Sequence, residues 1–147
     1  MSYDLYQIGG DAYLQRNIWA MNKIRWVLHE CGAFGRVVAD SELKWPEKKP
    51  APSSDHFDED TGDPLTDEAR EFVEMQAIAL AYHPEDLPPP HKFCSNDGWI
   101  VTPGECRAML IAIQSQDHPV NDEDSNRWAE FVRFIGICAE TGGFRVL

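Results

Sequence analysis

The stretch SNRWAEFVRFIGICAETGGFRVL, residues 125–147, decides the fold. Its apolar side chains recur at the i, i+3, i+4 and i+7 spacing of one helix face; they are Trp128, Phe131, Val132, Ile135, Cys138 and Ala139. We predict a helix that begins near Asp124 and ends at Gly142, followed by a short strand over residues 144–147. So short a strand is not stable alone, so the chain end needs a partner in a sheet.

That partner is predicted at the other end of the chain. Residues 3–8, YDLYQI, combine aromatic and branched side chains and end at Gly9 and Gly10, which indicates a strand and a turn. A helix is then predicted from a cap at Asp11 to about Cys31, with a glycine behind it. Because apolar residues cover more than half of this helix, we expect it at the centre of the core. Four tryptophans are expected in the same core: Trp19, Trp26, Trp99 and Trp128.

Two further helices are predicted in the middle of the chain. One begins at a Thr66 cap and runs to Tyr82, and the other begins at a capping box formed by Thr102 and Glu105. Residues 36–39 indicate a brief strand, and residues 40–64 lose periodicity and carry four prolines, which predicts a long acidic loop. The predicted fold is α+β, mostly helical with about four helices, and has a small antiparallel or mixed sheet formed by the chain ends. We expect a single domain over residues 1–147.

The net charge of the chain limits the kinds of partner that it is expected to bind. The chain has 25 Asp and Glu residues and 13 Lys and Arg residues, which gives a net charge of −12. The resulting negative field repels phosphate groups, so we expect the protein to bind neither nucleic acid directly nor the surface of an anionic membrane. No apolar run approaches the length of a membrane span, so a cytoplasmic location is expected. The 4 cysteines are widely spaced, which is typical of reduced thiols and not of a disulfide framework.

Most of the negative charge lies in one tract. Nine acidic residues stand between Asp55 and Glu74, against Arg70 alone. A calcium loop does not fit, because counting from Asp58 puts Asp63 at the sixth position, which needs Gly, and Ala69 at the twelfth, which needs Glu. We interpret the tract as a solvated, flexible loop that can serve as a partner-binding surface. The candidate partner-binding residues are Asp55, Asp58, Glu59, Asp60, Asp63, Glu68 and Glu71.

A weak metal pattern lies further along the chain. Its four candidate ligands, of the types that Zn²⁺ accepts, are His91, Cys94, Cys106 and His118. Structural zinc sites usually show two close ligand pairs, and this pattern has one. We therefore predict no metal and no other cofactor.

The two chain ends and the segment between them resemble small uncharacterised proteins of actinobacterial phages and prophages. The resemblance rests on the opening YDLY-x-IGG, on Gly98-Trp99 before a capped helix, and on the closing W-x2-F-x2-F helix with GGFRVL. It implies a phage-type origin and a helix-rich fold with a small sheet.

No nucleophile elbow, phosphate-binding glycine loop or metalloprotease motif is present in the sequence. We therefore expect a non-catalytic binding protein that engages a host protein, such as a host defence factor or a nucleic-acid-binding factor with a basic groove. A small enzyme or ligand-binding domain, with a pocket between the helices and the sheet, is the alternative.

Overall fold

The computed structural model describes residues 2–43, 52–81, 86–115 and 124–147, with the backbone alone at residues 40 and 75–81. Within these ranges it confirms the predicted α+β class, with four α-helices and a four-stranded antiparallel sheet. The strands are β1 Ser2–Gln7, β2 Tyr13–Asn17, β3 Trp99–Val101 and β4 Phe144–Val146. The α-helices are α1 Ile18–Glu30, α2 Asp67–Ala81, α3 Pro103–Gln114 and α4 Ser125–Ala139. Short 3-10 helices are η1 Asp40–Glu42, η2 Ser54–His56 and η3 Pro90–Phe93.

The chain ends pair in one sheet, as predicted, and they form its centre. The strand order is β2-β1-β4-β3, and Leu5 of β1 is paired with Val146 of β4. Beyond the strands the pairing continues, because the backbone N–H groups of Asp4 and Leu147 donate to each other's carbonyls at 2.7 and 2.8 Å. Both central strands are thereby held on two sides.

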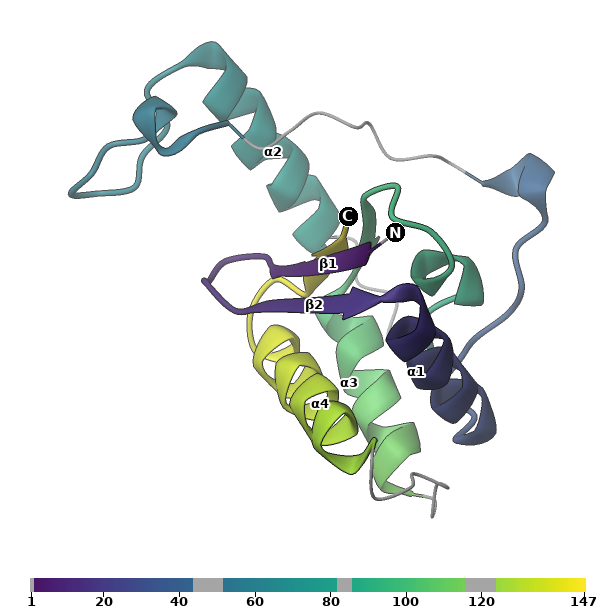
Figure 1. The fold of residues 1–147 in the computed structure, drawn as a ribbon. Helices are drawn as coiled ribbons and strands as arrows, with labels where there is room; N and C mark the ends of the chain where they lie inside the picture. Colours follow the sequence, from purple (N-terminus) through teal and green to yellow (C-terminus); the bar gives the residue numbers. More distant parts are fainter. Residues whose placement is uncertain (1, 44–51, 82–85, 116–123) are drawn as a thin grey trace.

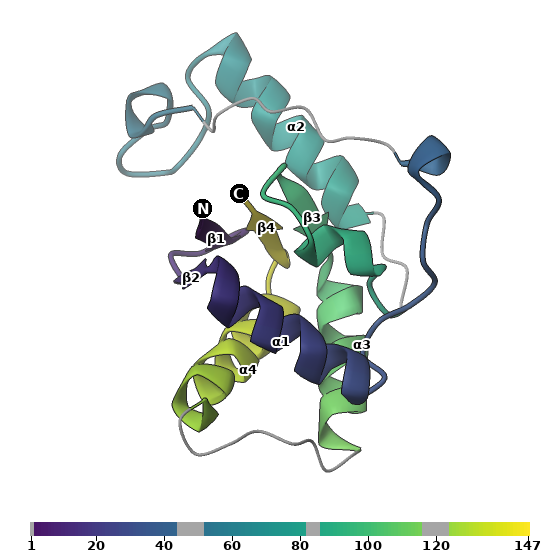
Figure 2. The same ribbon diagram turned by 45° about the vertical axis from the view of Figure 1, so that its right-hand side comes forward.

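The hydrophobic core lies on one face of this sheet. Figures 1 and 2 show α1, α3 and α4 on that face and α2 on the opposite side of the sheet. Phe144 is fully buried, with its ring centroid 6.0 Å from Phe93 and 5.2 Å from Phe134. Alternate residues of β1 and β4 are fully or almost fully buried beside it: Tyr3, Leu5 and Val146. The period of two along the strands therefore separates a core face from an outer face.

The first predicted helix is wrong over its opening turns. Residues 13–17 form β2, which pairs with β1 as a hairpin, and α1 begins only at Ile18. The cap is Asn17 and not Asp11, because the Asn17 side chain accepts a hydrogen bond of 2.8 Å from the N–H of Ala20. Its predicted end is confirmed, since Gly32 adopts φ 69° just behind the helix.

Two of the four tryptophans expected in the core are not there. Trp99 and Trp128 are buried, whereas Trp19 is 74% and Trp26 51% exposed on α1. A helix that covers a sheet buries only the side that faces the sheet. These two tryptophans lie seven residues apart, on the solvent side of α1.

The helix starts predicted at Thr66 and Thr102 are confirmed. Thr102 and Glu105 form the predicted capping box of α3, and the Thr66 hydroxyl accepts from the N–H of Ala69 at the start of α2. Positive φ after α4 occurs at Gly143, one residue later than the glycine expected to end that helix. A Cβ at Gly143 would lie 2.0 Å from the Val101 carbonyl oxygen, so this close approach requires glycine. The strand predicted over residues 36–39 does not form.

Candidate interaction surface

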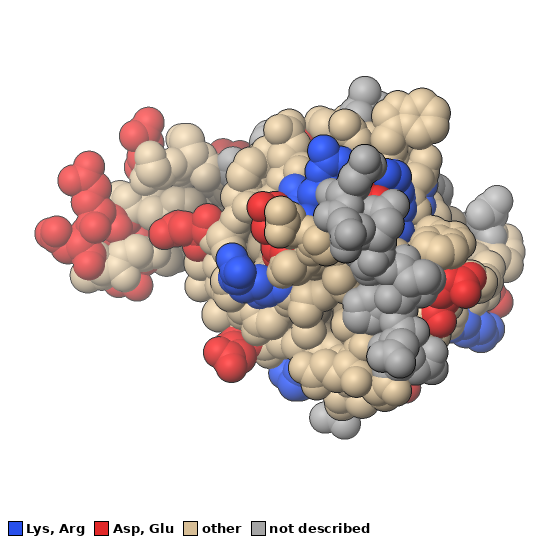
Figure 3. All heavy atoms as spheres, turned by 60° about the horizontal axis from the view of Figure 1, so that its bottom comes forward, with Lys and Arg blue, Asp and Glu red and all other residues tan. Residues whose placement is uncertain are grey.

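The acidic tract forms a distinct part of the molecule, which we call the acidic arm and define as residues 52–81. It comprises η2, a turn and α2, and it lies on the far side of the sheet from α1, α3 and α4 (Figures 1 and 2). Nine acidic residues and one arginine give the arm a net charge of −8, out of −12 for the chain. In Figure 3 the acidic side chains gather on this projecting part, at the left of the view.

The tip of the arm is a hydrogen-bonded turn that lies within the loop predicted over residues 40–64. Phe57 and Pro64 form an antiparallel bridge, and Asp58 and Asp63 are joined by an N–H to carbonyl bond of 2.8 Å. The Asp58 carboxylate accepts from the N–H groups of Asp60 and Thr61 at 2.8 and 3.0 Å. These donors hold the pKa of Asp58 below its ordinary value. Residues 44–51 of the predicted loop, which include Trp45, lie outside the described residues.

The base of the turn is fixed by the start of α2. The Thr66 hydroxyl caps the helix and also lies 2.8 Å from Nδ1 of His56, while the N–H of Leu65 donates to the carbonyl of His56 at 2.7 Å. Ala69 is fully buried at this point. The turn and the first helical turns therefore form one hydrogen-bonded unit.

Six of the seven predicted partner-binding residues are exposed on this unit: Asp55, Glu59, Asp60, Asp63, Glu68 and Glu71. The seventh, Asp58, is only partly exposed, and its carboxylate accepts the hydrogen bonds that hold the turn. Asp67 and Glu74 extend the exposed acidic surface, and Asp67 pairs with Arg70 at 2.5 Å, within the same helix. The one Lys or Arg side chain of the arm is thus paired within α2, and the other eight acidic residues carry the net charge of −8.

The weak candidates for metal ligands that the structure describes, His91, Cys94 and Cys106, are not gathered into a metal site. Among the residues that the structure describes, no three His, Cys, Asp or Glu side chains are placed to hold a metal ion. Cys106 is buried, which raises the pKa of its thiol, whereas Cys94 is exposed with Sγ 3.2 Å from the Pro90 carbonyl. His91 packs edge-on against Trp99, and burial and then the charge of Lys92 lower its pKa. His118 lies outside the described residues.

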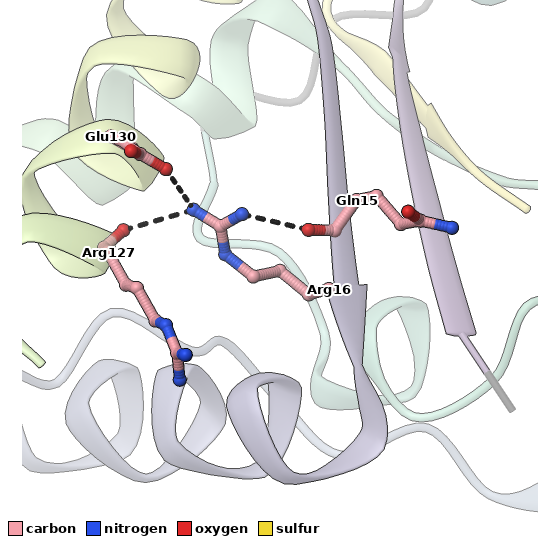
Figure 4. A network of polar contacts seen from close by, with 4 residues as sticks. All are labelled: Gln15, Arg16, Arg127 and Glu130. Carbon is pink, nitrogen blue, oxygen red and sulfur yellow. Dashed lines mark hydrogen bonds and ion pairs between the residues drawn. The ribbon is translucent and has the colours of Figure 1, made fainter.

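A second polar cluster, which the sequence did not indicate, closes the outer edge of β2 (Figure 4). The Arg16 guanidinium donates to the Gln15 carbonyl at 2.8 Å, to the Arg127 carbonyl at 3.3 Å and to Glu130 at 2.8 Å. Its side chain is only 10% exposed, so it fills the space between β2 and α4. Because the Arg16 side chain donates a hydrogen bond to the Gln15 carbonyl, that carbonyl cannot pair with a further strand, and the edge of the sheet at β2 is protected.

The outer face of the sheet carries exposed tyrosines. Tyr6 and Tyr13 pack with their centroids 5.0 Å apart, and the Tyr13 hydroxyl donates to Asp4 at 2.5 Å. That bond and the nearby negative charge raise the pKa of Tyr13 to about 12. The glycine pair at Gly9 and Gly10, directly behind the first strand, was the signal that could have revealed this hairpin.

None of the described helices is long and apolar enough to cross a membrane. Comparison of the chain with models of protein families, with curated proteins and with solved structures finds no match.

Proposed function

We propose that the chain is a small acidic, non-catalytic binding protein of phage or prophage type. In this proposal the acidic arm engages a basic surface of a host protein, such as the groove of a nucleic-acid-binding or defence factor. The observation that supports it is the concentration of nine carboxylates on one ordered, projecting unit of 30 residues. A net charge that keeps a protein soluble can be spread over its whole surface, so solubility alone does not require the carboxylates to be concentrated in one place.

Order in the arm supports a binding role for physical reasons. A flexible charged loop loses conformational entropy when it binds, at about 1–2 kcal/mol per residue whose backbone becomes fixed. The turn at Asp58 and the cap at Thr66 already fix the backbone that presents Glu59 and Asp60. Fixed charges of one sign also steer an oppositely charged partner, chiefly by raising the association rate.

The test compares two variants that remove the same amount of charge from different places. The arm variant neutralises Glu59→Gln, Asp60→Asn, Glu68→Gln and Glu71→Gln. The body variant neutralises four exposed acids outside the arm: Asp11→Asn, Glu30→Gln, Glu42→Gln and Asp86→Asn. Neither variant touches Asp58, so the turn stays intact.

Each protein is immobilised and exposed to an actinobacterial lysate at low and at high salt, and captured proteins are identified by mass spectrometry. The proposal predicts one basic protein that wild type and the body variant retain at low salt, that high salt releases, and that the arm variant fails to retain. Equal loss in both variants would mean that net charge alone attracts cations. Equal capture by all three proteins would exclude the arm as the binding surface.

A further inference from the structure

The solvent side of α4 contains a glycine that nothing inside the molecule requires. Gly136 lies in the interior of the helix, and a Cβ built on it would meet no atom within 4 Å. Glycine destabilises a helix interior by about 1 kcal/mol relative to alanine. Its φ is not positive, so backbone conformation does not demand glycine either.

An exposed apolar side chain follows this glycine in the sequence. Ile137, the next residue, is 42% exposed, and Ile111 on the neighbouring helix α3 is 69% exposed. Arg107 donates to the Ala139 carbonyl at 3.1 Å, and Ile111 follows one helical turn later on the same face of α3. Ile137 therefore borders a notch, the position at Gly136 that lacks a side chain, and Ile111 adds an exposed apolar side chain on the neighbouring helix.

Charges on the same face are arranged symmetrically about the notch. Arg133 precedes Gly136 by three residues and Glu140 follows Ile137 by three, and both side chains are exposed. Neither side chain forms an ion pair with another residue in the part of the chain that the structure describes. Glu140 is also the C-cap of α4, where the helix dipole disfavours a negative charge.

We infer that this face of α4 binds a second copy of the chain, in an antiparallel two-fold dimer centred between Gly136 and Ile137. In that arrangement Ile137 of each protomer enters the notch over Gly136 of its partner, and Arg133 lies opposite Glu140 of its partner. The two ion pairs lie about 5 Å from the axis along each helix, at 1.5 Å per residue. Without a side chain at Gly136 the helices can approach to the short end of the usual 8–10 Å range.

The charge pattern selects this orientation over the parallel one. In a parallel two-fold pair each residue faces its own copy, so Arg133 would face Arg133 and Glu140 would face Glu140. Net charge does not prevent the antiparallel dimer, because the acidic arm lies on the other side of the sheet from α4 (Figures 1 and 2). At physiological salt, exposed charges are screened over about 8 Å.

Sedimentation velocity of the full chain across a dilution series tests the dimer. Wild type is expected to show a monomer–dimer equilibrium. Arg133→Glu and Glu140→Arg each turn two attractive contacts into two repulsive ones and should raise the dissociation constant about tenfold or more. The double variant R133E/E140R restores both pairs and should return to within about threefold of wild type. Gly136→Gln fills the notch and should abolish the dimer.

Arg127→Glu is the matched control, because it makes the same charge change on α4 but off this face. It should leave the dissociation constant unchanged within about threefold. A chain that is monomeric at every concentration overturns the inference. So does a dimer that persists in both single reversals, a double variant that does not recover, or an Arg127→Glu effect as large as that of Arg133→Glu.

Discussion

Replacing Phe144 by alanine should destabilise the whole domain. Phe144 is fully buried, stands on a central strand and packs against the rings of Phe93 and Phe134. Truncation of a buried phenylalanine costs about 3–5 kcal/mol, out of the ~5–15 kcal/mol that typically stabilise a domain. At 2–4 °C per kcal/mol for a chain of this size, the melting temperature should fall by roughly 6–20 °C. Thermal unfolding followed by circular dichroism, and urea unfolding, measure both quantities.

Trp19→Ala is the matched control, since it also truncates a large aromatic residue. Trp19 is 74% exposed, so the variant should stay within about 0.5 kcal/mol of wild type. If Phe144→Ala melted with wild type, the closing strand would not belong to the core and the sheet order would be wrong. If Trp19→Ala were as destabilising as Phe144→Ala, α1 would pack on another element through its outer side.

Three further predictions concern single side chains. In the native protein a thiol reagent should modify the exposed Cys94 at once, and the other thiols only after unfolding, because they are buried: Cys31, Cys106 and Cys138. Asp58→Asn keeps a hydrogen-bond acceptor for the turn and Asp58→Ala does not, so amide hydrogen exchange at residues 60 and 61 should rise only in the alanine variant. Folding lowers the pKa of Asp58, so the carboxylate stabilises the fold above its unfolded pKa, and this stabilisation is lost as the pH falls. Tyr13 should titrate at about 12 in an absorbance titration, and Asp4→Asn should bring it back towards 10.0; this bond stabilises the fold below pH 10 and ceases to do so as the pH rises through 12.

Local signals in the sequence predicted the helices with clear caps. The capping box at Thr102 and the cap at Thr66 are determined by side chains within three residues, so they can be identified without tertiary information. Pairing of the chain ends was also predictable, because a three-residue strand behind a long apolar helix needs a partner. Together with the apolar helices α1 and α4, these elements account for most of the core.

The hairpin strand β2 was missed because the local sequence conflicts with a strand. Leu14, Ile18 and Met21 match helical spacing, and residues 13–17, YLQRN, do not alternate between apolar and polar side chains. In the structure the Asn17 side chain accepts a hydrogen bond from the N–H of Ala20 and starts the helix there. The residues before Asn17 form a strand because β1 is available as their partner. Exposure of Trp19 follows from the same error, since a shorter α1 covers the sheet with one side only.

The candidate surface was predictable in composition but not in conformation. Charge counting located the acidic tract, yet the turn at Asp58 depends on backbone hydrogen bonds that a charge count does not show. The notch at Gly136 was equally invisible, because a helical glycine becomes informative only when the space above it is known.

The rate at which the acidic arm associates with its purified basic partner tests the central claim most directly. Stopped-flow or surface-based kinetics over a range of ionic strength would compare wild type, the arm variant and the body variant. If the arm steers binding, the association rate of wild type and of the body variant falls steeply with salt, while that of the arm variant starts lower and changes little. Identical association rates and salt slopes for all three proteins would contradict the account.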